Sequence, residues 1–177
     1  MAVTCLVVMG VSGAGKSTIA GLLAERLGWP MAEADDFHSA SNVAKMREGE
    51  ALTDADRAPW LRSLREWIEA RTAEGRSSVM ACSALRHRYR DVLRGPDAVV
   101  GEVRFVHLSG AHEVIGARLD HREGHFMPAG LLDSQEAALE PLGPDEDGVV
   151  VDVAHGPQEL VRVILAELGI DPEEAKA

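Results

Sequence analysis

Cysteine is scarce in this chain of 177 residues, which contains only Cys5 and Cys82. The two cysteines lie far apart in the sequence and each is part of an apolar run. Neither a disulfide framework nor a zinc-binding cluster is therefore expected. This composition is typical of a reducing compartment, and we expect a cytoplasmic protein.

Basic residues and long apolar runs are also in short supply. The chain has 18 lysines and arginines against 29 acidic residues, which gives a net charge of −11. Such a charge disfavours nucleic acid and anionic membranes as partners. The first segment, MAVTCLVVMG, is too short to span a bilayer and lacks the basic start of a signal peptide. An anionic ligand must therefore meet a local cluster of positive groups.

The chain does have enough apolar residues for a core, because 46% of its residues are hydrophobic. Its length is that of about one domain, so we expect a single domain over residues 1–177. Runs rich in Val, Leu and Ile alternate with segments of helical period, which is typical of an α/β fold with a parallel sheet. Strands are predicted at Cys5–Met9, Trp29–Ala34, Ser78–Cys82, Val103–Leu108 and Val149–Val153.

Helices are predicted in the intervening segments. They are expected at Ser17–Leu27, directly after Asp56 with Pro59 in the first turn, and at His112–Leu119, Ala129–Leu139 and Pro157–Leu168. A polar segment without clear period predicts a lid at about residues 118–130. The acidic stretch Pro141–Gly148 is expected to be a solvated loop, and the tail from Asp171 onward is expected to fray.

The strongest motif is Gly10-Val-Ser-Gly-Ala-Gly-Lys16-Ser17, which matches G-x-x-x-x-G-K-S between an apolar strand and an amphipathic helix. Its glycines allow successive backbone N–H groups to face a phosphate at the positive end of the helix. Lys16 is expected to act catalytically by bridging the outer phosphates, and Ser17 to offer its hydroxyl to Mg²⁺. The alternative, a purely structural glycine turn, is disfavoured by the complete motif. The predicted ligands of a nucleoside triphosphate here are Gly10, Ser12, Gly13, Ala14, Gly15, Lys16, Ser17 and Thr18.

Two carboxylates follow the second predicted strand. Glu33 and Asp35 are expected to share one side of an extended backbone and to face the nucleotide. One carboxylate can hold Mg²⁺ through water while the other accepts the proton of an acceptor hydroxyl. The alternative is an acidic loop with a helix N-cap. Beside the phosphate-binding loop we favour a functional role, with Asp35 as the catalytic base and Ser17, Glu33 and Asp35 around the metal.

Five segments carry a family resemblance. They are MGVSGAGKST, EADDFH with NVAKM, LTDADRAPWL, ACSALRHRYRDVLR, and REGHFMPAGLLDSQ with LEPL. Through them the chain resembles, from Met9 to Val153, the small P-loop gluconate kinases. The resemblance implies a three-layer, adenylate-kinase-like core with sheet order 2-3-1-4-5, helices on both faces and a mobile lid. It also implies ATP-dependent phosphorylation of D-gluconate at the 6-hydroxyl, giving 6-phosphogluconate and ADP, and a homodimer.

Three positions depart from the pattern of that family. Glu33 stands where many members have Asp, which puts its share in metal binding in doubt. Ser39 replaces a usual proline after His38, a change expected to alter only loop stiffness. Glu136 replaces the usual aromatic residue after Gln135, which puts local packing or a dimer contact in doubt.

The substrate side needs a cationic fork for the carboxylate of gluconate and hydrogen-bonding groups for its hydroxyls. Arg57 and Arg86 are predicted for the carboxylate, because each begins an element near the carboxyl edge of the sheet. Each can instead form a structural salt bridge. His38 and Ser83 can reach sugar hydroxyls, although a loop or capping role for His38 is an equal alternative.

The lid region carries three further candidates. Arg122 is predicted to be catalytic by stabilising the charge of the transferred phosphoryl group. Arg118 is expected to touch adenine or the polyphosphate, and His125 to contact substrate and help exclude water. Either arginine can instead pair with a neighbouring glutamate. The nucleobase is expected near Asp152–Pro157, after the last strand.

Two rival interpretations remain open on the sequence. A shikimate kinase shares the size, the phosphate-binding loop and an acidic pair, but that family typically has a Gly-Gly turn where this chain has Cys82-Ser-Ala-Leu85. A nucleotide-binding regulatory module would transfer nothing, and would be favoured by missing catalytic groups. Lys16, Asp35 and Arg122 are all present, so we favour the kinase.

Overall fold

The computed structural model describes residues 2–120 and 130–176. They form a five-stranded parallel sheet in the order β2-β3-β1-β4-β5, the order that the resemblance implies. The strands are β1 (Cys5–Met9), β2 (Met31–Glu33), β3 (Ser78–Ala81), β4 (Val103–Ser109) and β5 (Gly148–Asp152). All five predicted strands are confirmed, with ends that differ by at most a few residues.

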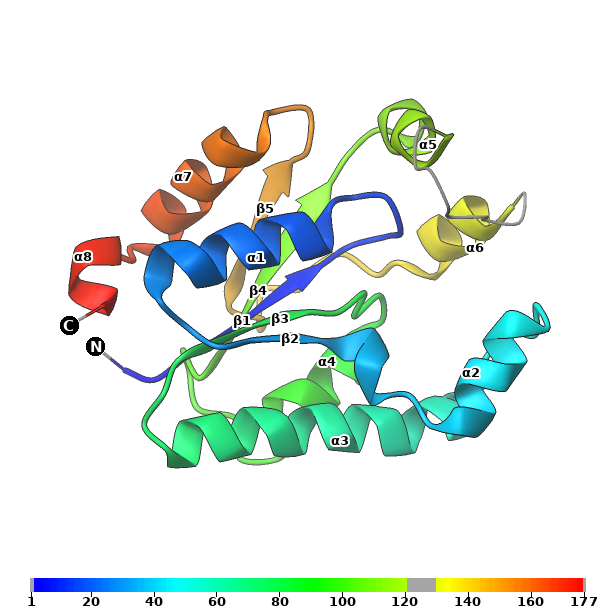
Figure 1. The fold of residues 1–177 in the computed structure, drawn as a ribbon, viewed down its shortest axis with the longest axis horizontal. Helices are drawn as coiled ribbons and strands as arrows, with labels where there is room; N and C mark the ends of the chain where they lie inside the picture. The colour runs from blue at the N-terminus through cyan, green and yellow to red at the C-terminus, as the bar shows by residue number, and fades with distance from the viewer. Residues whose placement is uncertain (1, 121–129, 177) are drawn as a thin grey trace.

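The helices cover both faces of the sheet, as Figure 1 shows. α1, α7 and α8 lie on one face, α3 and α4 lie on the other, and α2, α5 and α6 gather at one end. The bounds are α1 (Lys16–Leu27), η1 (Ala34–Phe37, a 3₁₀ turn), α2 (Ala40–Arg47), α3 (Asp54–Ala73), α4 (His87–Arg94), α5 (His112–Asp120), α6 (Leu131–Ala138), α7 (Pro157–Leu168) and α8 (Pro172–Ala175). This is the predicted three-layer arrangement.

β1 is the centre of the fold and every one of its residues is buried. It pairs with β3 on one side and β4 on the other, so that Val7 is level with Met80 and with Phe105. Leu6 and Val8 face the core formed with α1 and α7, whereas Val7 faces the core formed with α3. Alternate residues of one strand thus fill two cores, which explains its uninterrupted apolar sequence.

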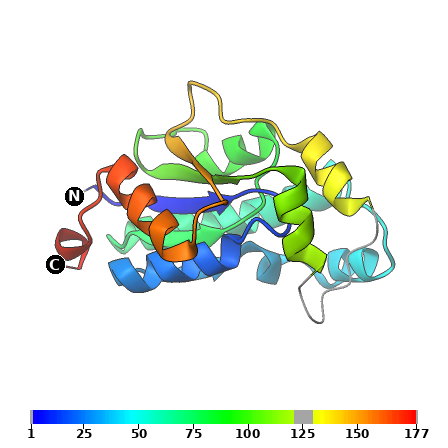
Figure 2. The ribbon, with the colours of Figure 1, turned by 90° about the horizontal axis from the view of Figure 1, so that it is seen from above.

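The carboxyl ends of the strands define the working end of the molecule. Both views place the two chain termini at the opposite end from α2, α5 and α6 (Figures 1 and 2). The glycine loop follows β1, η1 follows β2, and residues 82–86 follow β3. Ligands of open parallel sheets bind at this edge, so these loops are where a site is expected.

Helix α3 begins earlier than the sequence indicated. Its N-cap is Thr53, whose hydroxyl accepts from the N–H of Asp56 at 3.1 Å, while the Asp56 carboxylate accepts from the N–H of Thr53 at 2.9 Å. This capping box places Asp56 inside the first turn and Pro59 beyond it, so the predicted helix start was wrong.

Two segments expected to be loose are held in place. The Glu146 side chain, in the stretch predicted to be solvated, is fully buried and pairs with the equally buried guanidinium of Arg90 at 2.5 Å. At the C-terminus, Asp171 caps α8, and Ala175 packs against the core that includes α1. The sequence predicted neither contact, because the composition of a segment does not show which of its side chains finds a distant partner.

We predict that Glu146→Ala lowers the free energy of unfolding by about 3–5 kcal/mol, because it leaves the Arg90 guanidinium buried without its counter-charge. Urea denaturation followed by circular dichroism measures this change. Glu167→Ala, on the exposed side of α7, is the matched control and is expected to stay within about 0.5 kcal/mol of wild type. Equal stabilities of the two variants would contradict the role of the buried pair.

Candidate active site

The glycine loop between β1 and α1 has a backbone that only glycine adopts easily. Gly10, Gly13 and Gly15 all have positive φ, at 145°, 84° and 96°. A Cβ at Gly10 would lie 2.8 Å from the carbonyl oxygen of Leu108, and one at Gly13 would lie 2.7 Å from Cγ of Leu119. The loop is therefore pressed against β4 and α5, and its shape is fixed by close packing as well as by backbone freedom.

Lys16 and Ser17 open helix α1 directly after this loop. The ammonium of Lys16 donates to the carbonyl of Val11 at 3.0 Å, a contact that folds the side chain back over the loop. The first N–H groups of a helix have no acceptor within it, and they carry its positive partial charge. The loop and the helix start therefore form an anion-binding cradle with a lysine at its mouth.

A cavity of about 200 Å³ lies beside the cradle. Its lining residues are Gly13, Ala14, Gly15, Thr18, Ile19, Arg118, His155, Pro157 and Leu160. The cavity connects the glycine loop with the start of α7, which is where the nucleobase was expected. The guanidinium of Arg118 donates to the carbonyl of Val153, so this arginine is fixed at the edge of the cavity.

The two carboxylates after β2 are arranged differently from the prediction. Glu33 ends the strand, and Asp35 lies in the 3₁₀ turn η1, so the two do not share one side of an extended backbone. Trp60, on α3, donates its indole N–H to the carbonyl of Ala34 at 2.7 Å and so anchors the first residue of this turn. Asp35 itself remains exposed at the carboxyl edge of the sheet.

Cys82, at the end of β3, feels the charges of both Asp35 and Lys16. Burial raises the pKa of the Cys82 thiol to about 12, so the thiol is inert at neutral pH. The Asp35 carboxylate raises this pKa further and the Lys16 ammonium lowers it, which means that both charges lie within electrostatic reach of the same thiol. The phosphate side and the acidic side of the site therefore flank the end of β3, which lies between β1 and β2 in the sheet.

His38 is held in a defined orientation. Its ring stacks on the indole of Trp60, with 4.4 Å between the ring centroids, and its Nδ1 lies 3.4 Å from the side-chain amide of Asn42. Asn42 is buried and also donates to the carbonyl of Asp56 at 2.9 Å. Burial lowers the pKa of His38, which keeps the imidazole neutral at pH 7. Nothing in the sequence indicates this stacking, because it depends on how the end of η1 packs against α3.

The two candidate arginines differ in their contacts. Arg57 donates to the carbonyl of Leu52 at 2.7 Å, lies 3.8 Å from the carboxylate of Asp54, and stands over the ring of Tyr89. Arg86 precedes α4 as its N-cap residue, and within residues 2–120 and 130–176 its side chain has no hydrogen bond or ion pair. Of these two arginines, Arg86 is therefore the one whose guanidinium is available to a ligand.

The loop that carries Ser83 and Arg86 is strained and clamped. Ala84, between them, has φ of 43°, a conformation that non-glycine residues rarely adopt. The carbonyl of Ala84 accepts a hydrogen bond from the buried Arg90 at 2.8 Å. The carbonyl of Ser83 accepts from the N–H of Gly10 at 3.3 Å. The turn is thereby tied to the glycine loop on one side and to α4 on the other.

Some of the predicted residues stand outside what the structure describes. Arg122 and His125 fall within residues 121–129, so their predicted roles stay predictions. One residue at the site was missed: Gln135 on α6 accepts from the N–H of Ser12 at 2.6 Å. The family motif ending in SQ contained this glutamine, but nothing local to it indicated a contact with the glycine loop.

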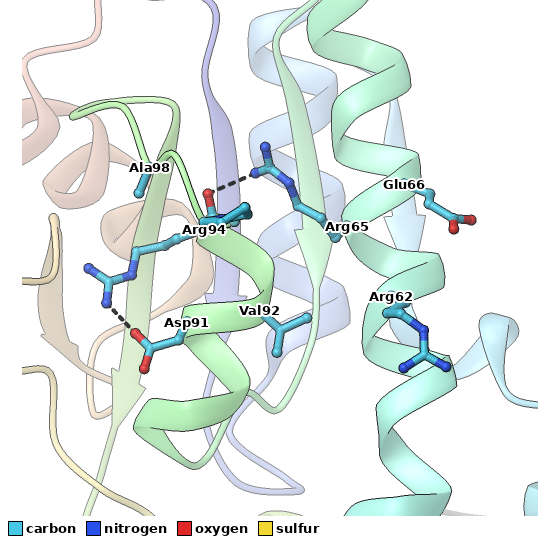
Figure 3. Close-up of a pocket in the computed structure, with 9 residues that line it drawn as sticks. Arg62, Arg65, Glu66, Asp91, Val92, Arg94 and Ala98 are labelled. Atoms are coloured by element: carbon cyan, nitrogen blue, oxygen red, sulfur yellow. Dashed lines mark hydrogen bonds and ion pairs between the residues drawn. The ribbon is translucent and has the colours of Figure 1, made fainter.

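A second cavity, of about 670 Å³, lies elsewhere. Figure 3 shows it between α3 and α4, where Arg65 donates to the carbonyl of Arg94, and Arg94 in turn pairs with Asp91. None of the residues predicted from the sequence for catalysis or ligand binding lines it. The volume of a cavity therefore does not identify the candidate active site in this fold, whereas the anion-binding cradle does.

Known proteins share this sequence and this fold. A family model described as "AAA domain" matches residues 6–142. A gluconokinase of Gluconobacter oxydans (strain 621H) is 48% identical over 166 residues, which cover 92% of each protein. A solved sugar kinase from Janibacter sp. HTCC2649 has a TM-score of 0.86 and 52% identity, covering 97% of both chains. A gluconokinase from Sinorhizobium meliloti 1021 has a TM-score of 0.82 and 44% identity, covering 94% of this chain and 91% of the other. At these identities and coverages, the chain belongs to the gluconokinase family.

Proposed function

We propose that this protein transfers the γ-phosphoryl group of ATP to the 6-hydroxyl of D-gluconate and releases 6-phosphogluconate and ADP. One observation carries the proposal beyond the family relationship. The loop after β1 that leads into α1 and Lys16, and the turn after β2 that carries Asp35, stand at the same carboxyl edge of the sheet on the two sides of β3. That is the arrangement a direct transfer from a phosphate to a hydroxyl requires.

On the nucleotide side, the polyphosphate lies on the glycine loop and the start of α1. The N–H groups of the loop donate hydrogen bonds to its oxygens, and Lys16 bridges the outer phosphates. Arg118, His155 and Pro157 line the adjoining cavity and bind the nucleoside. The proposed ATP-binding residues are Gly10, Ser12, Gly13, Ala14, Gly15, Lys16, Ser17, Thr18 and Arg118.

The residues around Lys16 suit a magnesium ion. Ser17 offers a hydroxyl, and Glu33 and Asp35 offer carboxylates, which are the hard oxygen ligands that Mg²⁺ prefers. When bound, the ion neutralises charge on the β- and γ-phosphates. Asp35 is exposed at the edge of the sheet and can reach the ion through water.

On the acceptor side, Asp35 orients the 6-hydroxyl and takes its proton as the phosphoryl group transfers. Arg86 binds the carboxylate at the other end of gluconate, because its guanidinium has no partner in the part of the chain that the structure describes. The neutral imidazole of His38, stacked on Trp60, and the hydroxyl of Ser83 bind sugar hydroxyls. Arg57 is already held by Leu52 and Asp54, so it supports this wall of the site.

Further parts of the proposal extend past the described residues. Arg122 stabilises the charge of the transferred phosphoryl group and His125 closes over the substrate, as the sequence predicts. The homodimer, which the family resemblance implies, and the cytoplasmic location, which the cysteine content predicts, complete the proposal. None of the helices in residues 2–120 and 130–176 is long and apolar enough to cross a membrane.

We predict that purified protein releases ADP from Mg·ATP in the presence of gluconate, and that mass spectrometry identifies the product as 6-phosphogluconate. Shikimate and a reaction without acceptor are the controls, and both are expected to stay at background. Release with shikimate alone would change the substrate class and keep the chemistry. Tight ATP binding without acceptor-dependent release would indicate the regulatory module instead.

We predict that Asp35→Asn lowers kcat at least about 100-fold, because the amide cannot accept the proton of the hydroxyl. The affinity for ATP, measured by isothermal titration calorimetry, is expected to stay near that of wild type. Asp36→Asn, one residue further along η1 and equally exposed, is the matched control and should keep most of its turnover. Near-normal turnover of Asp35→Asn would remove Asp35 from catalysis.

We predict that Arg86→Gln raises KM for gluconate about tenfold or more, since a hydrogen bond between charged groups contributes about 1.5–3 kcal/mol. KM for ATP should change little. Arg57→Gln is expected to raise KM for gluconate less, because its guanidinium is engaged within the protein. If Arg57→Gln raised KM for gluconate more than Arg86→Gln, the gluconate carboxylate would be assigned to Arg57 and the supporting role to Arg86.

A further inference from the structure

Gln135 makes a contact with the phosphate-binding loop that no role assigned so far explains. Its side-chain oxygen Oε1 accepts from the backbone N–H of Ser12 at 2.6 Å, and its Nε2 lies 3.4 Å from the Ser12 hydroxyl oxygen, to which it donates. The two residues are separated by 123 positions in the sequence. An amide of α6 thus uses both of its polar atoms on a single residue of the loop.

Helix α6 holds this amide in a fixed place. Leu132 is buried against the core that includes α1. The imidazole of His112, at the start of α5, lies 2.8 Å from the carboxylate of Glu136. Just after the helix, the N–H of Glu140 donates to the carbonyl of Leu85 at 2.7 Å. The helix is therefore attached both to α5 and to the loop that carries Arg86, and Gln135 is directed at Ser12 from a supported position.

Ser12 belongs to the glycine loop, and loops of this kind hold phosphate oxygens with their backbone N–H groups. A phosphate oxygen that accepts from this N–H takes the position that Oε1 of Gln135 occupies. The two oxygens cannot share that position, and both carry negative partial charge, so the amide oxygen has to move away. A half-turn of the amide then brings Nε2, which is a donor, toward the phosphate oxygen.

We propose that Gln135 is a residue that recognises the terminal phosphoryl group of ATP. Its side-chain amide changes hydrogen-bond partner when nucleotide binds. Before binding, Oε1 accepts from the N–H of Ser12; after binding, Nε2 donates to an oxygen of the terminal phosphoryl group. Glutamine suits this exchange because it carries an acceptor and a donor on one planar group, whereas a glutamate would only accept and would repel the phosphate. The proposal rests on the phosphoryl transfer from ATP described above.

The test is the ratio of two dissociation constants, those for ADP and for AMP-PNP, a non-hydrolysable ATP analogue. Isothermal titration calorimetry with Mg²⁺ measures both for wild type, Gln135→Met and Gln135→Glu. Met keeps the length of the side chain without its hydrogen bonds, and Glu keeps its shape with only acceptors. Ser134→Ala, an exposed neighbour on the same helix, is the control.

We expect Gln135→Met to reduce the preference for AMP-PNP over ADP about tenfold. This is the change that the loss of one hydrogen bond to a charged group produces. Gln135→Glu should reduce it further, because a carboxylate adds repulsion, and Ser134→Ala should leave it unchanged. If Gln135 only supported the loop, its substitution would weaken the binding of both nucleotides equally. A preference unchanged in both Gln135 variants, with thermal unfolding showing them folded, would therefore overturn the proposal.

Failure of the proposed function has a different signature. Wild-type protein that binds AMP-PNP but releases no ADP in the presence of gluconate would refute the transfer reaction. The nucleotide preference of the Gln135 variants does not depend on gluconate, so it tests the role of Gln135 in either case.

Discussion

The site depends on the close approach of three strand ends at Gly10. Its N–H donates to the carbonyl of Ser83 after β3, and a side chain at this position would collide with the carbonyl of Leu108 on β4. Because β1 lies between β3 and β4, the residue that follows β1 lies between the ends of these two strands. Only a residue without Cβ fits there, and the glycine loop, the Ser83 turn and the end of β4 take their relative positions from this contact.

A buried ion pair holds the acceptor side of the site in place. Arg90 and Glu146 are both withdrawn from water, and a charge pair of this kind is stable only when its remaining hydrogen bonds are satisfied. Arg90 satisfies them with the carbonyls of Ala84, Glu140 and Pro141. The same guanidinium thus holds the strained turn before Arg86 and the segment that follows α6. The groups that would bind gluconate and those that would bind ATP therefore share one set of supports.

The sequence predicted the sheet, its helical cover and the phosphate-binding loop because each depends on local rules. Apolar runs such as Cys5–Met9 report burial on both faces of a strand, and the glycines of the loop report positive φ. The prediction failed where a distant group changed the local preference. The backbone after β2 forms a 3₁₀ turn that is hydrogen-bonded to Trp60 of α3, so Asp35 is not in the extended segment expected from its spacing.

What the sequence by itself determined is therefore the architecture and the identity of the phosphate-binding loop, together with the family to which these motifs belong. Only the tertiary structure decided which side chains meet: His38 with Trp60, Arg90 with Glu146, and Gln135 with Ser12. The physical reason is that backbone conformation and burial follow from neighbouring residues, whereas a side-chain contact between distant segments depends on the strand order and the packing of every element between them.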